Sequence, residues 1–172
     1  RSKDNNDISA DLTELSRNRV FVICSGAKSI LDLEKTFEKL ETFGIPRVSY
    51  NSDYMPGFWY EETNFFVDNN FKNIDDIANY LKLIKDLKHQ SSVLIFNKVP
   101  KNKSIDKNLI EKWIIRSVKK AELTKIKGKE LTPFLIEEIN NLSKNKTLEA
   151  NSALIINNAL IAGKIAIKFN SI

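Results

Sequence analysis

The sequence has very little cysteine or histidine: one cysteine, Cys24, and one histidine, His89. A single cysteine excludes a disulfide bond within the chain and is typical of a reducing compartment. So few of these residues also argue against a zinc site built from this chain. No apolar run has the length that a bilayer-spanning helix needs, and the first residues carry no apolar segment typical of a secretory signal. We therefore expect an intracellular, cytoplasmic protein that does not enter a membrane.

What the chain does contain is ordinary for a folded protein. Of its 172 residues 42% are hydrophobic and 28% are charged, which predicts a single domain over residues 1–172 with a real core. The net charge of +5 comes mostly from lysine. It could indicate a polyanionic partner, but a composition biased toward lysine and asparagine explains it as well. Because the phenylalanines do not recur with lysine or arginine as in RNA-binding motifs, we expect no nucleic-acid partner.

One stretch near the N-terminal end predicts a buried strand, a tight turn and a helix. Val20–Cys24 is an unbroken apolar run, short enough to be a strand buried on both faces. Ser25 and Gly26 interrupt it. Ser29, with Asp32 three residues later, resembles a capping box, and apolar residues then follow at helical spacing to about residue 43. Ligands of open α/β sheets gather at such an edge.

Lys28 lies just before the first turn of this predicted helix. The helix dipole disfavours a cation there. Partial burial and the positive helix end would both lower the pKa of the amine, giving a neutral nucleophile able to attack a carbonyl. The alternative is a lysine that points into solvent or binds a phosphate. Spacing alone favours this alternative.

A second polar group precedes the strand, in the segment DISADLTEL. In an extended chain the side chains of Asp7, Ser9 and Asp11 would face the same side. Two carboxylates and a hydroxyl grouped in this way suit a hard cation or a sugar phosphate. The alternative is that Ser9 or Asp11 simply caps a short helix. The sequence leaves the two interpretations even.

The rest of the chain alternates strand and helix patterns, which predicts an α/β fold with a mainly parallel (mixed) sheet flanked by helices and a helical C-terminal third. Within the last, mostly apolar segment, expected to be one or two buried helices, asparagines need polar partners. The expected strands cover residues 45–50, 65–67 and 92–96. The expected helices cover residues 74–87 (capped by Asn73), 104–121 (capped by Ser104), 132–142 (opened by Thr132-Pro133) and 147–169.

Several separate motifs closely resemble, in the right order, the C-terminal half of the pseudouridine-5'-phosphate glycosidase family, also called indigoidine synthase A-like. The resemblance covers residues 7–166 and is weakest between 60 and 93. The motifs are DISADLTEL, ICSGAKSILDLEKTFEKLETFGIP, NKVP, GKELTPFLIEEINNLS and TLEANSALIINNALIAGKIA.

The resemblance implies reversible cleavage of the C–C glycosidic bond of pseudouridine 5'-phosphate to uracil and ribose 5-phosphate, by an α/β homotrimer. It implies that Lys28 forms a Schiff base with the opened ribose. It further implies that Asp7 binds a divalent metal, typically manganese, and that Ser9, Ala10 and Asp11 contact the substrate. Asn151 would help to hold the uracil.

This chemistry fits an amine nucleophile. A C–C glycosidic bond has no good leaving group, so protonating an oxygen, the usual glycosidase route, does not help. An amine that captures C1' as an iminium provides an electron sink, and the uracil carbon leaves once a donor has protonated it. With the resemblance, a nucleophilic amine becomes the favoured interpretation of Lys28, and a lysine that points into solvent or binds a phosphate becomes the less favoured one.

The family's N-terminal half has no counterpart in this sequence. That half contributes the glutamate general acid, a phosphate-side lysine and a histidine, so we expect it as a partner from the same protein and expect the chain alone to be inactive. Two other functions stay open. The chain could be a catalytically incomplete piece or degenerate relative that serves as a binding or oligomerisation module, or a basic, phosphate-binding regulatory domain.

Overall fold

The computed structural model describes residues 9–172, except for the side chain of Lys129. Within this part a four-stranded sheet has the strand order β1-β4-β2-β3, and all three pairings are parallel. The predicted mainly parallel sheet is therefore confirmed. The strands are β1 (Phe21–Cys24), β2 (Arg47–Tyr50), β3 (Asn69–Phe71) and β4 (Val93–Phe96).

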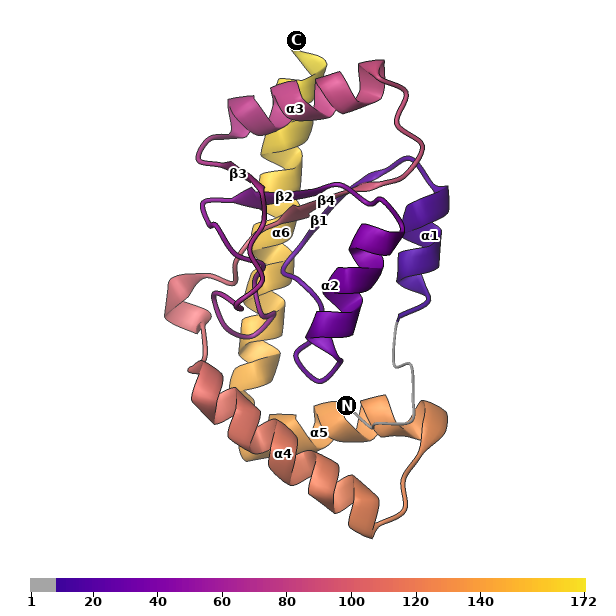
Figure 1. Ribbon diagram of the computed structural model, residues 1–172. Coiled ribbons are helices and arrows are strands. Elements are labelled where there is room, and N and C mark those ends of the chain that lie inside the picture. Colours follow the sequence, from indigo (N-terminus) through magenta and orange to yellow (C-terminus); the bar gives the residue numbers. More distant parts are fainter. Residues whose placement is uncertain (1–8) are drawn as a thin grey trace.

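Helices surround the sheet and make up most of the rest of the described chain (Figure 1). The C-terminal third is helical, as predicted, and its last helix, α6, runs along most of the length of the molecule. The helices are α1 (Asp11–Arg17), α2 (Leu33–Thr42), α3 (Ile74–Asp86), α4 (Lys107–Leu123), α5 (Leu131–Leu142) and α6 (Lys146–Asn170), with short 3₁₀ turns η1 (Lys101–Lys103) and η2 (Gly128–Glu130).

The central strand β4 shows how the sheet separates two cores. All four of its residues are buried, and successive side chains of a strand point to opposite faces. Leu94 and Phe96 pack with residues of α1 and α2 on one face. Val93 and Ile95 pack with residues of α3 and α6 on the other face. The apolar VLIF run thus holds one layer of helices on each side of the sheet.

A third core lies beyond the carboxyl ends of the strands, where α4 and α5 cross the lower end of α6 (Figure 1). Ile110 and Ile114 of α4 pack there with Leu135 and Ile139 of α5. Trp59, from the loop after β2, joins the same core. This arrangement brings α5 and the loop after β2 toward the strand ends where ligands of α/β proteins bind.

Several predicted boundaries are wrong, because helix starts depend on tertiary contacts that the local pattern does not contain. The cap of α2 is Asp32, whose side chain accepts a hydrogen bond from the Lys35 amide, and not Ser29. The cap of α4 is Asp106 and not Ser104. Helix α5 begins at Leu131, one residue before the predicted Thr132 cap.

The expected strand at residues 65–67 is also wrong. Phe66 makes only an isolated antiparallel bridge to Tyr54, and the third strand is Asn69–Phe71. The Asn73 cap of α3 is confirmed, because its side chain accepts a hydrogen bond from the Asp76 amide.

The last segment is a single helix, and the expectation that it is buried is wrong for one of its faces. Thr147, Ala150, Leu154, Ile161 and Ile165 point into the molecule. The opposite face carries exposed apolar side chains at Leu148, Ile155, Ile156, Leu160 and Ile167. Among the described helices α6 alone has the length and apolar composition of a membrane span. That criterion is weak evidence, because it rests on length and composition alone and a core helix of a soluble protein can also meet it.

Candidate functional site

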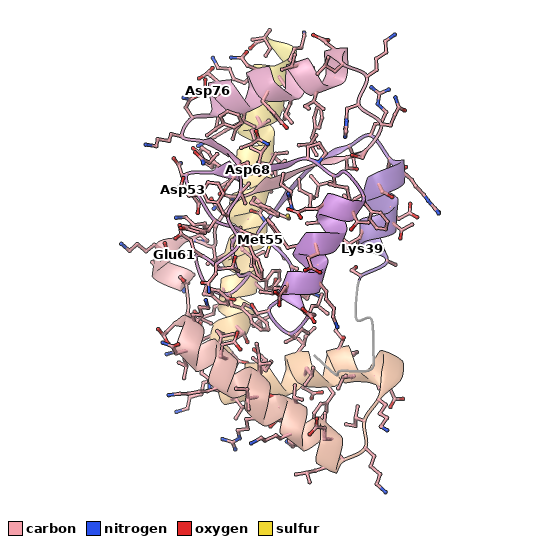
Figure 2. All side chains as sticks on the ribbon, viewed as in Figure 1. Lys39, Asp53, Met55, Glu61, Asp68 and Asp76 are labelled. Carbon is pink, nitrogen blue, oxygen red and sulfur yellow. The ribbon has the colours of Figure 1, made fainter. Side chains whose placement is uncertain are left out.

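A cavity of about 780 Å³ lies on the α1/α2 side of the sheet and reaches the carboxyl end of β1. Its inner wall is apolar and comes mainly from α1, β1, β4 and Met55, which Figure 2 labels beside α2. Polar groups are fewer than apolar ones and come from several segments that are distant in the sequence. They include Ser9, Asp11, Lys28 and Thr132. An apolar hollow with a few convergent polar groups is the usual form of a small-molecule site.

The turn that carries Lys28 is fixed by the segment 55–58 of the following loop. The Phe58 amide donates to the Ser25 carbonyl at 3.0 Å, and the buried Ser29 hydroxyl donates to the Gly57 carbonyl. Within the turn, the Leu31 amide donates to the Lys28 carbonyl at 2.9 Å. Buried hydrogen bonds of this kind define one backbone conformation.

Lys28 itself differs from the expectation in two ways. Helix α2 begins at Leu33, so Lys28 does not stand at its N-terminus. The expected partial burial is also wrong, because the residue is exposed at the cavity. Both differences have one cause: Ser29 is drawn to Gly57, so residues 25–32 form a longer loop before the helix starts. Among the described residues that line the cavity, Lys28 is the one amine.

The segment before β1 forms the short helix of the second interpretation in its described part, but neither Ser9 nor Asp11 is its N-cap residue. Helix α1 begins at Asp11, with Ala10 at the N-cap position and the Asp11 amide donating to Ser9 Oγ at 3.3 Å. Ser9 and Asp11 nevertheless line the same cavity as Lys28, and Ala10 is exposed beside them. Asp7, the residue predicted to bind metal, lies outside the described residues.

The carboxylates of the described chain do not by themselves form a metal site. Asp11 and Glu14 both line the cavity, but residues 9–172 contain no group of three or more histidine, cysteine, aspartate or glutamate side chains that could hold an ion. A manganese site would therefore need Asp7 or groups from elsewhere, and it stays a prediction.

Asn151, predicted to hold uracil, is half-buried on α6 and is not part of the cavity wall. Two later asparagines of α6 are better connected. Asn157 donates to the Lys98 carbonyl at 3.2 Å. Asn158 bonds to Ser25 and Asn97. The sequence signal for them was the occurrence of amides within an apolar helix, which indicates buried partners without naming them.

Cys24 also lines the cavity but is not a second nucleophile. Burial raises the pKa of its thiol to about 11, against a smaller opposing effect of a hydrogen bond with the Gly26 backbone. The reactive form of cysteine is the thiolate, so Cys24 remains a neutral thiol near pH 7 and contributes mainly apolar surface.

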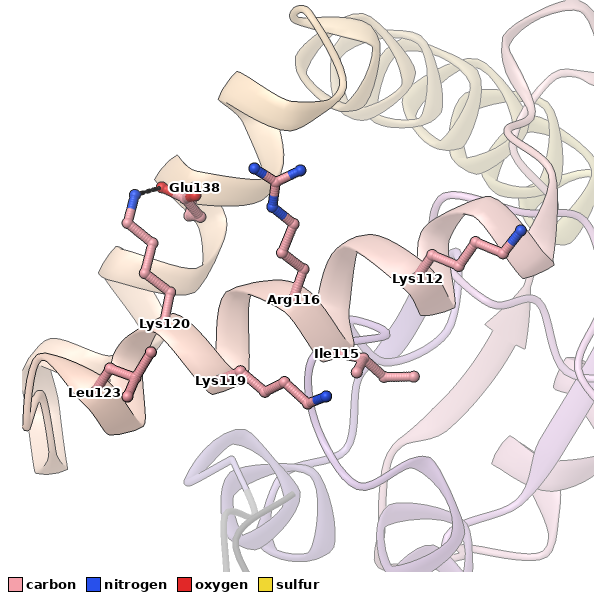
Figure 3. A pocket seen from close by; sticks show the side chains of 7 residues that line it. All are labelled: Lys112, Ile115, Arg116, Lys119, Lys120, Leu123 and Glu138. Atoms are coloured by element: carbon pink, nitrogen blue, oxygen red, sulfur yellow. Dashed lines mark hydrogen bonds and ion pairs between the residues drawn. The ribbon is translucent and has the colours of Figure 1, made fainter.

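A different hollow, of about 590 Å³, lies between α4 and α5 (Figure 3). Its cations are Lys112, Arg116, Lys119 and Lys120. Lys120 forms an ion pair with Glu138 at 2.6 Å, whereas Lys119 and Lys112 extend away from that pair in Figure 3. Cations that diverge over an open surface are typical of a solvated face. This hollow therefore gives little support to the basic, phosphate-binding alternative.

In the part of the chain that the structure describes, the fold and the cavity define a parallel α/β protein with one amine, two carboxylates and several hydroxyls on the wall of a mostly apolar hollow at one edge of its sheet. The family model described as "Indigoidine synthase A like protein" matches residues 1–168. The chain belongs to this family.

Curated relatives carry the name pseudouridine-5'-phosphate glycosidase. The protein of Petrotoga mobilis is 44% identical over 164 residues, which are 95% of this chain and 54% of the relative. That of Caldanaerobacter subterraneus subsp. tengcongensis is 41% identical over 166 residues, 96% and 54% of the two chains. The chain thus spans about half the length of the curated relatives it matches, consistent with the predicted C-terminal half.

Two solved structures share the fold. An indigoidine synthase A-like protein from Thermotoga maritima superimposes with a TM-score of 0.82 at 33% identity, over 93% of this chain and 53% of that one. The prealnumycin C-glycosynthase AlnA, solved with ribulose 5-phosphate, gives a TM-score of 0.89 at 24% identity, over 95% and 54%. The second likeness concerns the fold alone.

Proposed function

We propose that the chain supplies the Schiff-base half of a pseudouridine-5'-phosphate glycosidase, which reversibly converts pseudouridine 5'-phosphate to uracil and ribose 5-phosphate. The observation that carries the proposal is the position of Lys28 on the same cavity as Ser9 and Asp11. The names of the curated relatives support the reaction. The exposure of Lys28 toward the cavity leaves its amine accessible to a sugar carbon.

In this proposal Lys28 Nζ forms a bond to C1' while the C1'–O4' bond of the ribose ring breaks; O4' leaves with the electron pair and takes up a proton, and the nitrogen gives one up. A donor outside the described residues protonates the uracil carbon. The C1'–carbon bond then breaks with its electron pair leaving to uracil, while the nitrogen lone pair forms the C=N bond of the iminium. Water hydrolyses the iminium, releasing ribose 5-phosphate and the free amine. Ser9 and Asp11 would orient the sugar hydroxyls, with manganese held through Asp7.

We further propose that the N-terminal half of the same protein covers the exposed face of α6 and the free edge of β1. Val20 and Phe21 at that edge are partly exposed, and Phe21 contacts Phe169 of α6 edge to face. The edge and the helix face thus both expose apolar side chains, of the kind that marks a protein interface. About half of each relative's length is left over to cover it. The homotrimer is proposed from the family resemblance, and the intracellular location from the single cysteine and the apolar pattern of the sequence.

The test of the function is reductive trapping. Ribose 5-phosphate and sodium borohydride should attach a reduced sugar to Lys28 of the 172-residue chain, located by peptide mass spectrometry. The adduct should be lost in Lys28→Ala and retained in Lys39→Ala, which removes a surface lysine stacked on Phe43. An adduct that persists in Lys28→Ala, or that spreads evenly over the lysines, would contradict the proposal.

The second candidate is a catalytically incomplete or degenerate module that binds or assembles with other chains. Its support is the matched share of only about half of each relative. A chain that fails to trap ribose 5-phosphate but still assembles would favour this candidate. Release of uracil by the chain alone would exclude it.

A further inference from the structure

Three polar residues from distant parts of the sequence meet beneath the turn that carries Lys28. Ser25 follows β1, Asn97 follows β4, and Asn158 lies in the middle of α6. Asn97 Nδ2 donates to Asn158 Oδ1 at 2.9 Å. Asn158 Nδ2 donates to Ser25 Oγ at 3.1 Å. Ser25 is 2% exposed and Asn97 is 5% exposed, so water can hardly replace these partners.

The side-chain amide of Asn158 forms hydrogen bonds through both its oxygen and its nitrogen. Its oxygen accepts from Asn97, which follows β4, and its nitrogen donates to Ser25, which follows β1. The two strand ends are also joined directly, since the backbone amide of Asn97 donates to the Cys24 carbonyl at 2.8 Å. Helix α6 is thereby bonded to the sheet at the point where the Lys28 turn begins.

The turn has little freedom once Ser25 is fixed. The Ser25 carbonyl accepts the Phe58 amide at 3.0 Å. Gly26 follows with φ of +81°, and a Cβ on it would lie 2.0 Å from the Pro56 carbonyl oxygen. Lys28 is three residues after Ser25 and reaches the cavity, whereas Ser25, Asn97 and Asn158 are not part of the cavity wall.

We propose that Asn158 is a positioning residue for Lys28: it holds the Ser25–Gly26 turn against α6 and so fixes the direction from which the amine enters the cavity. The expected effect on the reaction of Lys28 rests on the proposed function. The expected effect on the turn rests on the hydrogen bonds alone. Because Asn158 does not reach the cavity, it should affect the rate of attack more than sugar binding. A small misplacement of a reacting group lowers the rate by about 10- to 100-fold.

The experiment compares Asn158→Ala with Asn157→Ala in the 172-residue chain. Asn157 is a matched control, because it is the adjacent amide on the same helix and donates to the Lys98 carbonyl instead. Borohydride trapping of ribose 5-phosphate on Lys28 is measured against sugar concentration. In Asn158→Ala the maximal trapping rate should fall at least about tenfold while the half-saturating concentration stays within about twofold. In Asn157→Ala both should stay near those of the unmodified chain.

Amide hydrogen exchange provides a second measurement that needs no sugar. In Asn158→Ala the amides of Phe58 and Leu31, which bond across and within the turn, should exchange at least about tenfold faster than in Asn157→Ala. Amides in the interior of α3 serve as the folding control and should be unchanged.

The outcomes separate the two proposals. If the unmodified chain traps sugar on Lys28 and Asn158→Ala matches Asn157→Ala in rate and exchange, the positioning role is wrong and the function stands. If the unmodified chain traps no sugar, the function fails, and faster exchange confined to Asn158→Ala would still establish that this residue holds the turn. A loss of exchange protection throughout Asn158→Ala, α3 included, would show a general structural role and overturn the positioning proposal.

Discussion

At the scale of single residues, Gly26 limits what the Lys28 turn can tolerate. Its φ of +81° disfavours any L side chain, and a Cβ would meet the Pro56 carbonyl oxygen at 2.0 Å. Gly44 also has a positive φ, +60°, but nothing lies within 4 Å of its Cβ position. The pair separates the effect of conformation from the effect of close contact.

We therefore predict that Gly44→Ala lowers the free energy of unfolding by about 1–2 kcal/mol, for the left-handed backbone conformation alone. Gly26→Ala should lower it by about 1–3 kcal/mol for the strained φ and further for the contact with Pro56. Urea denaturation of both variants measures the difference. Equal losses would show that the segment 55–58 moves away freely and does not fix the turn.

A second prediction at this scale concerns pH. Burial raises the pKa of the Cys24 thiol to about 11 from 9.0. Between these values the unfolded chain releases the thiol proton and the folded chain keeps it, so ionisation favours unfolding. Stability from this group is fully present below pH 9 and falls as the pH rises toward 11.

The loss should reach about 2 kcal/mol at pH 11: two pKa units at about 1.4 kcal/mol each set a limit of about 3 kcal/mol, and the folded thiol is itself half ionised at that pH. Denaturant unfolding at pH 8, 9, 10 and 11 measures it. Cys24→Ala is the control, because lysines and tyrosines titrate in both proteins and only the unmodified chain has the thiol. Parallel pH profiles for the two proteins would contradict a buried, neutral Cys24.

At the scale of elements, the start of α2 shows what can be predicted from the sequence and what cannot. The VFVIC run and the helical spacing after it are local patterns, so a strand followed by a helix could be predicted. Ser29 and Asp32 are both residue types that often cap helices. Which of them caps α2 depends on the bond from Ser29 to the Gly57 carbonyl, 28 positions along the chain. A long-range contact of this kind is absent from any local window.

The same reasoning applies to the cavity and to α6. Ser9, Asp11 and Lys28 could be grouped in advance through the family motifs, whereas the contribution of Thr132 from α5 depends on how α5 is placed. Asn158 could be marked as needing partners, but Ser25 and Asn97 lie 133 and 61 positions away. The apolar composition of α6 predicts burial without saying which partner provides it.

The cap at Asp32 leads to a prediction about α2. Its carboxylate accepts the Lys35 amide at 3.1 Å, and such a cap stabilises a helix by about 1 kcal/mol. Asp32→Ala should lose about that amount in urea denaturation, and Asp32→Asn should lose much less because the amide oxygen still accepts. If Asp32→Asn loses as much as Asp32→Ala, charge rather than the hydrogen bond is the stabilising feature.

At the scale of the whole molecule, the long exposed face of α6 and the free edge of β1 argue that the described chain is one part of a larger packed unit. Two of the three cores already bury residues on the other face of α6. The exposed face is mostly apolar, although Glu149 and Ser152 are also exposed on it, and Phe21 at the edge of β1 contacts Phe169 of α6. The proposed occupant is the N-terminal half of the same protein.

The corresponding prediction uses the part of the Petrotoga mobilis glycosidase that lies outside the matched region, added in trans to the 172-residue chain. We expect a complex with 1:1 stoichiometry of the two parts, measured by calorimetry and size-exclusion chromatography with light scattering. Leu160→Asp should weaken it at least about tenfold, since it places a charge in an apolar interface. Ile115→Asp is the matched control: Ile115 is 52% exposed on α4 and Leu160 is 60% exposed on α6.

Uracil release from pseudouridine 5'-phosphate should appear only in the mixture, because Lys28 and the proton donor belong to different parts and only the mixture contains both. Lys28→Ala should abolish it without weakening the complex. Binding that Leu160→Asp leaves unchanged would place the interface elsewhere. Self-association of the chain through α6, or its binding to lipid vesicles in a manner that Leu160→Asp removes, would assign the exposed face to a different occupant.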